Sequence, residues 1–267
     1  MKKNKAIFTI WCTENYHNEI GISGLIKSLK HFHPNIPVQI VTTTPAEAGP
    51  IYEKYPVMMK PYSTLKFFDD YELVVHMDSD CTITGALDEI FTNNYDVACV
   101  RNFTHNGSCG RDSSEVVKIL GVPLGLTTDT FMNAGFVAIR SKQFLEDWLD
   151  GLYKLTWDGD DQNELNRIIN SGKYKVKVLD DHGMGVTYGV SNCWGNTSHW
   201  DSWKNLYLDN DQLYIDNQNG EKLKVKILHV AGGKPARESV FLGKMHREWL
   251  LDWVSDDVKE FLLKITN

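Results

Sequence analysis

The sequence predicts an α/β fold in which a mixed, mostly parallel central sheet is flanked by helices. Two observations carry this prediction. The first is a strand–helix–strand pattern at the start of the chain, which is typical of a parallel βαβ unit. The second is an apolar run at 73–77 that stops at the carboxylates Asp78 and Asp80. A buried strand that ends in this way presents its polar residues at the carboxyl edge of an open sheet, where ligands bind.

The first part of the chain supplies the βαβ unit. The β-rich segment 6–11 is expected to form a buried strand, and a polar turn follows it. Between residues 22 and 29, apolar side chains recur three and four positions apart. This spacing predicts an amphipathic helix with one buried face. The apolar segment 38–41 predicts the second strand.

The rest of the chain alternates between the same two patterns. Further strands are expected at 96–100, 131–140, 176–179 and 224–230, helices at 141–155, 160–169 and 249–265, and a helical turn at 87–91. Residues 182–220 interrupt this rhythm with many Gly, Asn, Asp and Trp residues, so we expect a loop-and-hairpin region there. No internal repeat or linker divides the 267 residues, and we therefore expect a single domain.

Composition limits the class of protein. A net charge of −7 provides no general attraction to nucleic acid. The five cysteines are scattered and form no Cys-x-x-Cys pair, which argues against a zinc ribbon and favours free thiols in a reducing compartment. No apolar stretch approaches the roughly 20 residues of a transmembrane segment. We expect a cytoplasmic protein of bacterial, viral or cytosolic type, with peripheral membrane association left open.

The segment Asp78-Ser79-Asp80 is the strongest candidate for chemistry. Two carboxylates separated by one residue offer hard oxygen ligands to a divalent cation, and a cation at this edge can hold a diphosphate. The spacing also occurs by chance in turns. The buried strand in front of it and the matching segments elsewhere favour a metal site.

Four further segments accompany this one in a fixed order along the chain. They are Phe8-Thr9-Ile10-Trp11-Cys12-Thr13-Glu14-Asn15-Tyr16, Phe131-Met132-Asn133-Ala134-Gly135-Phe136-Val137, Asp160-Asp161-Gln162-Asn163-Glu164-Leu165-Asn166 and His229-Val230-Ala231-Gly232-Gly233-Lys234-Pro235. Together the segments resemble the GT-A fold of nucleotide-sugar glycosyltransferases, most closely glycosyltransferase family 8. The resemblance spans roughly residues 6–237. It implies a nucleotide-binding half at 1–100, an acceptor-binding half at 101–240 and a C-terminal helix at 241–267.

The resemblance implies where the nucleotide lies. Tyr16 would stack on the base, with Thr13 and Asn15 beside it, and Ser79 would lie between the two metal-binding aspartates. A turn whose tyrosine packs on the surface is the alternative. Lys66 lies near the position where the family keeps a basic residue against the donor, although the spacing here is shorter. A solvated lysine is the alternative.

The resemblance also implies the sugar pocket. Asn133, Ala134 and Gly135 would line it, because small residues allow a ligand to approach the backbone closely. Asp161 would bind hydroxyl groups of donor or acceptor, and Gln162 would lie under the anomeric carbon. The family has Asp after the Gln, where this chain has Asn163. The alternatives are a strand with a glycine bulge and simple capping of a helix start.

The last segment implies the remaining metal ligand. His229 would join Asp78 and Asp80 as the third ligand of Mn²⁺ (or Mg²⁺), since imidazole is a suitable ligand for Mn²⁺. Lys234 would neutralise the diphosphate beside the amide of Gly232. The segment has one residue fewer between Gly and Lys than the family pattern. A structural histidine after a strand is the alternative.

These assignments predict a hexosyltransferase that uses a UDP-sugar (UDP-Gal, UDP-Glc or UDP-GlcNAc) and a hydroxyl acceptor on a glycan or other glycoconjugate. The resemblance implies retention of the anomeric configuration. An inverting enzyme, with a carboxylate such as Asp161 as its base, is one alternative. A sugar-nucleotide-binding protein without turnover and a nucleotidyltransferase also remain open. The turn after the first strand contains no Gly and one acidic residue, which counts against a nucleotidyltransferase.

Overall fold

The structure is a computed structural model of the 267-residue chain. It describes residues 5–12, 20–41, 60–79, 81–101, 132–154, 161–179, 186–190, 205–216, 222–229 and 254–267. For residues 20–21, 101 and 186–190 only the backbone is described.

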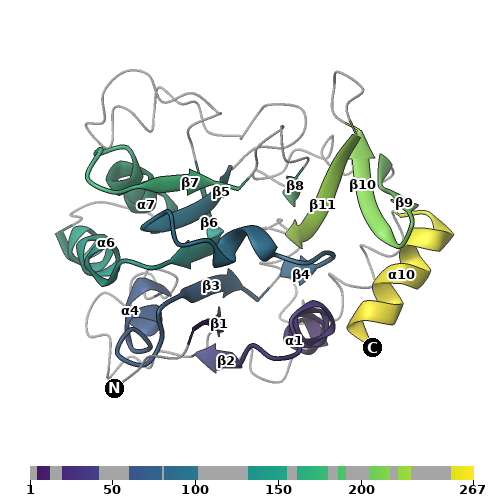
Figure 1. The fold of residues 1–267 in the computed structure, drawn as a ribbon, viewed down its shortest axis with the longest axis horizontal. Helices are drawn as coiled ribbons and strands as arrows, with labels where there is room; N and C mark the ends of the chain where they lie inside the picture. The colour runs from purple at the N-terminus through teal and green to yellow at the C-terminus, as the bar shows by residue number, and fades with distance from the viewer. Residues whose placement is uncertain are drawn as a thin grey trace, which may run out of the picture.

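A six-stranded sheet forms the centre of the molecule, with the order β2-β1-β3-β6-β5-β7. In Figure 1 these strands are stacked from bottom to top. Their bounds are β1 Ile7–Trp11, β2 Val38–Val41, β3 Val74–Asp78, β5 Val97–Arg101, β6 Met132–Ile139 and β7 Val176–Val178. The pairs β1–β2, β1–β3 and β5–β7 are parallel, whereas β6 is antiparallel to both of its neighbours. The sheet is therefore mixed, as the sequence predicted, with β6 as its reversed strand.

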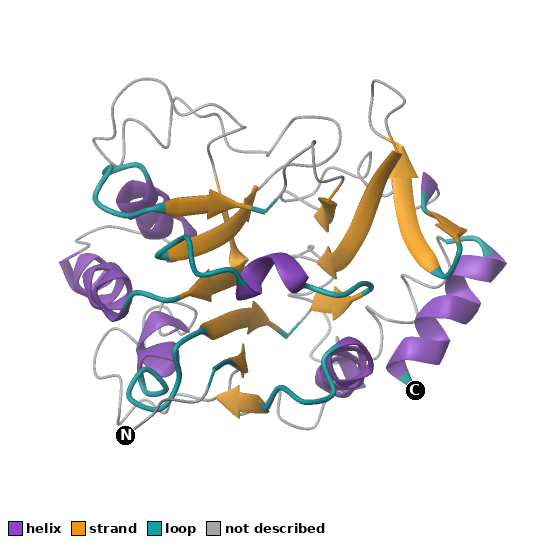
Figure 2. Cartoon of the chain, in the orientation of Figure 1, coloured by secondary structure: helices purple, strands orange, loops and turns teal. Residues whose placement is uncertain are grey.

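Both faces of this sheet are buried, because neighbouring residues of a strand point to opposite faces. In β3, Val75 packs with α1 (Ile20–Phe32) and the short 3₁₀ helix η3 (Asp88–Phe91), while Val74 packs with α6 (Lys142–Lys154) and α7 (Asp161–Ile169). The helix α4 (Lys60–Leu65) lies on the α6 side. Figure 2 shows these helices around the stacked strands.

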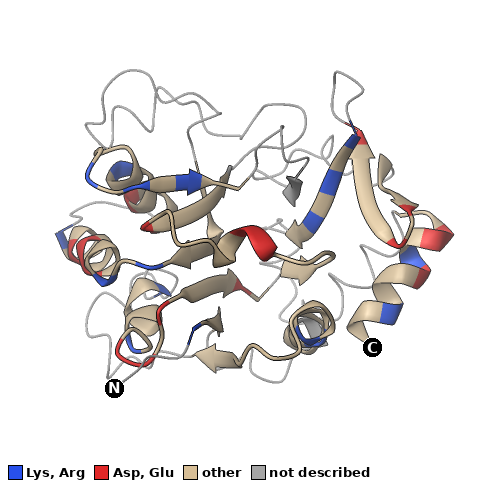
Figure 3. Ribbon diagram, viewed as in Figure 1, with Lys and Arg blue, Asp and Glu red and all other residues tan. Residues whose placement is uncertain are grey.

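A second, five-stranded sheet adjoins the first. Its strands are β4 Cys81–Ile83, β8 Val186–Val190, β9 Tyr207–Asp209, β10 Gln212–Asp216 and β11 Lys222–His229. The helix α10 (Asp256–Thr266) covers it and contacts α1 and β9. An ion pair between Glu89 and Lys226 links η3, which packs on the first sheet, to β11 of the second sheet. In Figure 3, η3 carries red acidic residues and β11 blue basic residues.

Most predicted elements are present, with shifted ends. The structure adds the helix α4 and the strand β4, which the sequence reasoning missed. The C-terminal helix begins at Asp256, within the predicted span 249–265. The proposed halves with boundaries at 100 and 240 remain a prediction. In the part of the chain that the structure describes, none of the helices combines the length and the apolar character that a bilayer crossing requires.

Candidate active site

Asp78 is the last residue of β3 and the centre of the candidate site. Its side chain lies on the same face of the sheet as Val74 and His76, which is the face covered by α4, α6 and α7. The imidazole Nε2 of His76 lies 3.3 Å from Oδ1 of Asp78. His76 is a buried strand residue, and its ring holds the carboxylate in place.

A buried lysine binds Asp78. The Nζ atom of Lys60 lies 2.8 Å from Oδ1 and 3.0 Å from Oδ2 of Asp78, and 3.0 Å from Oδ2 of Asp161. Lys60 is the first residue of α4 and is almost fully buried. Its ammonium group therefore bridges the carboxylate at the end of β3 and the carboxylate at the start of α7.

The sequence reasoning missed Lys60, and its proposal that Lys66 lies near the donor stays a prediction. Lys66 is exposed, one residue beyond α4, and its Nζ lies 5.0 Å from the centre of the Tyr62 ring. The lysine at Asp78 is therefore Lys60, which precedes the aspartate by 18 residues in the sequence. Its position upstream of the aspartate pair was the available signal. It was missed because α4 is too short for a helical pattern to indicate it.

The charges of this cluster are fixed by mutual contact. Burial by itself would raise the pKa of Asp78, but the charge of Lys60 and the hydrogen bond from His76 hold it well below its usual range. Burial would lower the pKa of Lys60, but Asp161 and Asp78 outweigh this effect and raise it. Burial lowers the pKa of His76. Asp78 is thus an anion and Lys60 a cation across the physiological pH range.

His229 approaches the same carboxylate from the second sheet. It is the last residue of β11, and its Nε2 lies 3.9 Å from Oδ2 of Asp78. Its ring packs against the backbone of Gly135, where a Cβ atom would lie 2.9 Å from Nδ1 and would overlap Cε1. Because no positive φ angle is found at Gly135, the glycine is needed here for space and not for backbone conformation.

The segment Asn133-Ala134-Gly135 lies at a break in the pairing of β6. The β5 residues Cys99 and Val100 pair with Val137 and Asn133, so that three residues of β6 bulge out between them. Side-chain oxygens accept the hydrogen bonds of the backbone amides that the bulge takes out of the sheet. Oδ1 of Asn133 accepts a hydrogen bond from the Gly135 amide at 2.6 Å. Bulges of this kind re-aim a strand and are common next to active sites.

The start of α7 borders this bulge. The backbone carbonyl of Asp161 accepts a hydrogen bond from the Trp148 indole at 3.0 Å, which anchors the helix start to α6. Oε1 of Gln162 accepts a hydrogen bond from the Ala134 amide at 3.1 Å. Asp161 and Gln162 therefore lie beside Lys60 and the bulge, as a shared site requires.

Two of the three predicted metal ligands, Asp78 and His229, can be tested for fit. Bonds of roughly 2.1 Å, typical of small divalent cations, can span the 3.9 Å between their nearest ligand atoms. A carboxylate oxygen and an imidazole nitrogen suit Mn²⁺. Among the residues that the structure describes, no group of three acidic, His or Cys side chains could hold a metal ion, and Asp80 lies outside those residues.

Of the remaining predicted site residues, the structure describes only Ser79. Ser79 follows β3 directly and is half-buried. The other residues lie outside the described part of the chain, namely Thr13, Asn15, Tyr16, Gly232 and Lys234. Their roles stay predictions.

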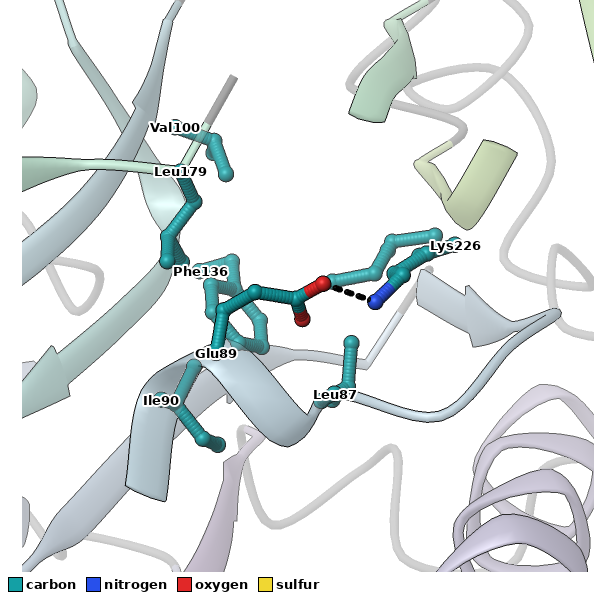
Figure 4. Close-up of a pocket in the computed structure, with 8 residues that line it drawn as sticks. Leu87, Glu89, Ile90, Val100, Phe136, Leu179 and Lys226 are labelled. Carbon is teal, nitrogen blue, oxygen red and sulfur yellow. Dashed lines mark hydrogen bonds and ion pairs between the residues drawn. The ribbon is translucent and has the colours of Figure 1, made fainter. Parts of the chain in front are cut away.

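A separate small pocket opens where the two sheets meet (Figure 4). Apolar side chains form most of its wall, and the ion pair between Glu89 and Lys226 forms the rest. None of the predicted site residues lines it. Since a sugar or phosphate needs several convergent polar groups, this pocket does not suit the donor.

This chain resembles known proteins in structure rather than in sequence. No protein-family model and no curated protein sequence matches the chain. Among solved structures, the bifunctional glycosyltransferase WbbM in its apo form matches 100% of this chain and 52% of its own, with a TM-score of 0.53 and 17% identity. The chain thus spans about half the length of WbbM.

The galactosyltransferase LgtC, in complex with donor and acceptor sugar analogs, matches 95% of this chain and 99% of its own. Its TM-score is 0.51 and its identity 12%. An active-site mutant of LgtC matches 95% of this chain and 99% of its own, with a TM-score of 0.53 and 14% identity. At these identities the likeness shows the fold. The predicted GT-A fold is therefore confirmed.

Proposed function

We propose that this chain is a metal-dependent glycosyltransferase that moves a hexose from a UDP-sugar to a hydroxyl group of a glycan or related acceptor. The observation that carries the proposal is the meeting of Asp78 and His229. These residues come from two different sheets, and their ligand atoms lie 3.9 Å apart at the carboxyl edge of β3. The fold shared with WbbM and LgtC supports the reaction class.

The residues present fit a divalent cation, which Asp78, Asp80 and His229 would hold. Mn²⁺ is favoured over Mg²⁺ because one ligand is an imidazole. When bound, the ion would act as a Lewis acid on the leaving diphosphate. The local charge supports this assignment, because two carboxylates, Asp78 and Asp161, surround the single ammonium group of Lys60.

Lys60 keeps the two carboxylates ionised and close together. Without it, the buried carboxylate of Asp161 and the half-buried carboxylate of Asp78 would repel each other, and at least one would take up a proton. With it, Asp78 stays available as an anionic ligand at neutral pH. The proposed role of Lys60 is therefore to organise the site at the reacting end of the donor, and Lys234 would assist at the diphosphate.

Retention of configuration is the outcome that the site favours. An inverting transferase needs a carboxylate base that faces the acceptor hydroxyl. The carboxylate of Asp161 is buried and contacts the ammonium of Lys60 at 3.0 Å, so the lysine and not an acceptor hydroxyl occupies this carboxylate. The neighbouring Gln162 cannot accept a proton at neutral pH. We therefore propose front-face attack, with the leaving phosphate taking the proton of the acceptor.

The test is a donor panel of UDP-Gal, UDP-Glc and UDP-GlcNAc with Mn²⁺, in which UDP release and sugar transfer are both measured. Asp78→Asn should lower turnover by at least about 100-fold, since a metal ligand contributes several kcal/mol to the transition state. Asp150→Asn, an exposed carboxylate on α6 that pairs with Lys154, is the matched control and should leave turnover unchanged. Full activity in excess EDTA would refute the metal-dependent reaction.

Binding provides a second test that does not need the acceptor. UDP with Mn²⁺ should raise the melting temperature, because a ligand of the native state stabilises it by mass action. NMR of the anomeric proton in the product then decides between retention and inversion.

A further inference from the structure

The bulge in β6 takes backbone groups out of the sheet, and each of them must find a partner elsewhere. In the pairing of the described strands, Ala134 and Gly135 face no residue of β3 or β5. The Ala134 amide donates to Gln162 and the Gly135 amide to Asn133. Side-chain oxygens therefore replace the strand partner at both positions.

Asn166 of α7 holds the segment just before the bulge. Its Oδ1 accepts a hydrogen bond from the Met132 amide at 2.6 Å, and its Nδ2 donates to the Met132 carbonyl at 2.8 Å. A residue of a neighbouring strand contacts both backbone groups of its partner in the same way. Asn166 thus acts as a strand partner that is supplied by a helix.

The same side chain also binds its own helix. Nδ2 of Asn166 donates a second hydrogen bond to the Gln162 carbonyl at 2.7 Å, and the side chain is fully buried. Residues four positions apart lie on one face of a helix, so Asn166 and Gln162 both face β6. The side-chain amides of Asn166 and Gln162 hydrogen-bond to β6 at Met132 and at Ala134, on either side of Asn133.

The hydrogen bond to Ala134 determines which way the Gln162 amide points. Of the two ends of a glutamine amide only the oxygen accepts a hydrogen bond, so the bond from the Ala134 amide assigns Oε1 to the strand. The Nε2 group of Gln162 is then the end of the amide that remains for a ligand. Gln162 is half-buried, whereas Asp161, Asn163 and Asn166 are buried.

We propose that Asn166 is a positioning residue of the transfer reaction: it fixes the bulge at Ala134 and Gly135 and the direction of the Gln162 amide. This inference rests on the proposed function. In the reaction, Asn166 touches neither donor nor acceptor. It acts by holding the β6 backbone at Ala134 and Gly135. Gln162 accepts a hydrogen bond from the first of these residues, and His229 packs against the second.

The test compares Asn166→Asp with the control Asn170→Ala. Asn166→Asp keeps an oxygen for the Met132 amide but points a carboxylate oxygen at two carbonyl groups. Asn170 is the matched control, because it lies one turn further along, is exposed, and hydrogen-bonds only within its own helix end. Each variant is assayed for kcat, for the KM of the donor, for UDP affinity with Mn²⁺ and for melting temperature.

We expect Asn166→Asp to lower kcat by about 10- to 100-fold, since small misplacements at a reacting centre have effects of this size. The affinity for UDP with Mn²⁺ should fall by less than kcat falls, because Asn166 contacts the Gln162 segment directly and reaches the His229 contact only through the bulge. Asn170→Ala should match the wild type. Hydrogen exchange of the 130–137 peptide should accelerate in Asn166→Asp only.

Three results would overturn the proposal. One is a kcat near the wild-type value in folded Asn166→Asp. The second is a loss of melting temperature without a loss of kcat, which would mark a purely structural role. The third is a failure of both Asn166→Asp and Asn166→Ala to fold while Asn170→Ala folds. A wild type that neither binds UDP nor transfers sugar would instead refute the proposed function.

Discussion

Gly135→Ala should disable the candidate metal site by steric overlap alone. The new methyl group would overlap Cε1 of the His229 ring and lie 2.9 Å from its Nδ1 and 2.8 Å from Oδ1 of Asn133. Ordinary separations between non-bonded heavy atoms are about 3.5 Å or more. To restore an ordinary contact at Nδ1, the ring must retreat by about 0.6 Å, and further to clear Cε1.

A displacement of this size exceeds what a metal site tolerates. Ligand distances in metal sites hold to about 0.2 Å. His229 is the only candidate ligand that the described part of the second sheet contributes. We therefore expect Mn²⁺ affinity to fall by about 10- to 100-fold, the range seen when the groups that orient a ligand are changed. Overpacking should also cost about 1–3 kcal/mol of stability.

Isothermal titration with Mn²⁺ in the presence of UDP measures the affinity, and urea unfolding measures the stability. Gly24→Ala is the matched control. Its Cβ would meet Thr266 at 3.6 Å, an ordinary contact, and it lies inside α1, so it should leave Mn²⁺ binding unchanged. Unchanged affinity and stability in Gly135→Ala would show that His229 does not pack against this glycine.

Three further predictions concern stability. In most helices a Gly→Ala substitution raises stability by about 0.5–1 kcal/mol. Gly151→Ala should instead lower the free energy of unfolding in urea by about 1–3 kcal/mol, because the methyl group would overlap the buried Glu164 carboxylate. A gain in stability would contradict this packing. Lys60→Met should cost about 3–5 kcal/mol, because it leaves the buried carboxylate of Asp161 and the half-buried carboxylate of Asp78 without their cation, and an unchanged urea midpoint would argue against the ion pair. Burial lowers the pKa of His33 below 6.5, so its contribution is present above that pH and is lost as the pH falls through the folded-state value. The urea midpoint should therefore fall between pH 7 and pH 5 more steeply in the wild type than in His33→Gln, and equal slopes would exclude His33 as a source.

The fold and part of the site could be predicted from local patterns. Apolar runs mark buried strands whatever their neighbours are, so the strand before Asp78 and the helix that begins at Asp161 were visible in the sequence. The resemblance of the five segments to glycosyltransferase family 8 implied a shared site. It placed His229 with Asp78, and in the structure Nε2 of His229 lies 3.9 Å from Oδ2 of Asp78.

Long-range packing decided the rest. Lys60 belongs to a six-residue helix, which is too short to produce a readable period, and its role depends on two carboxylates from other elements. Nothing in the local sequence of Met132 indicates that Asn166, from a helix 34 residues away in the sequence, completes its hydrogen bonds. Local propensity sets where strands and helices begin. Which buried polar groups find each other is settled only when those elements pack, since each must be satisfied from whatever lies beside it.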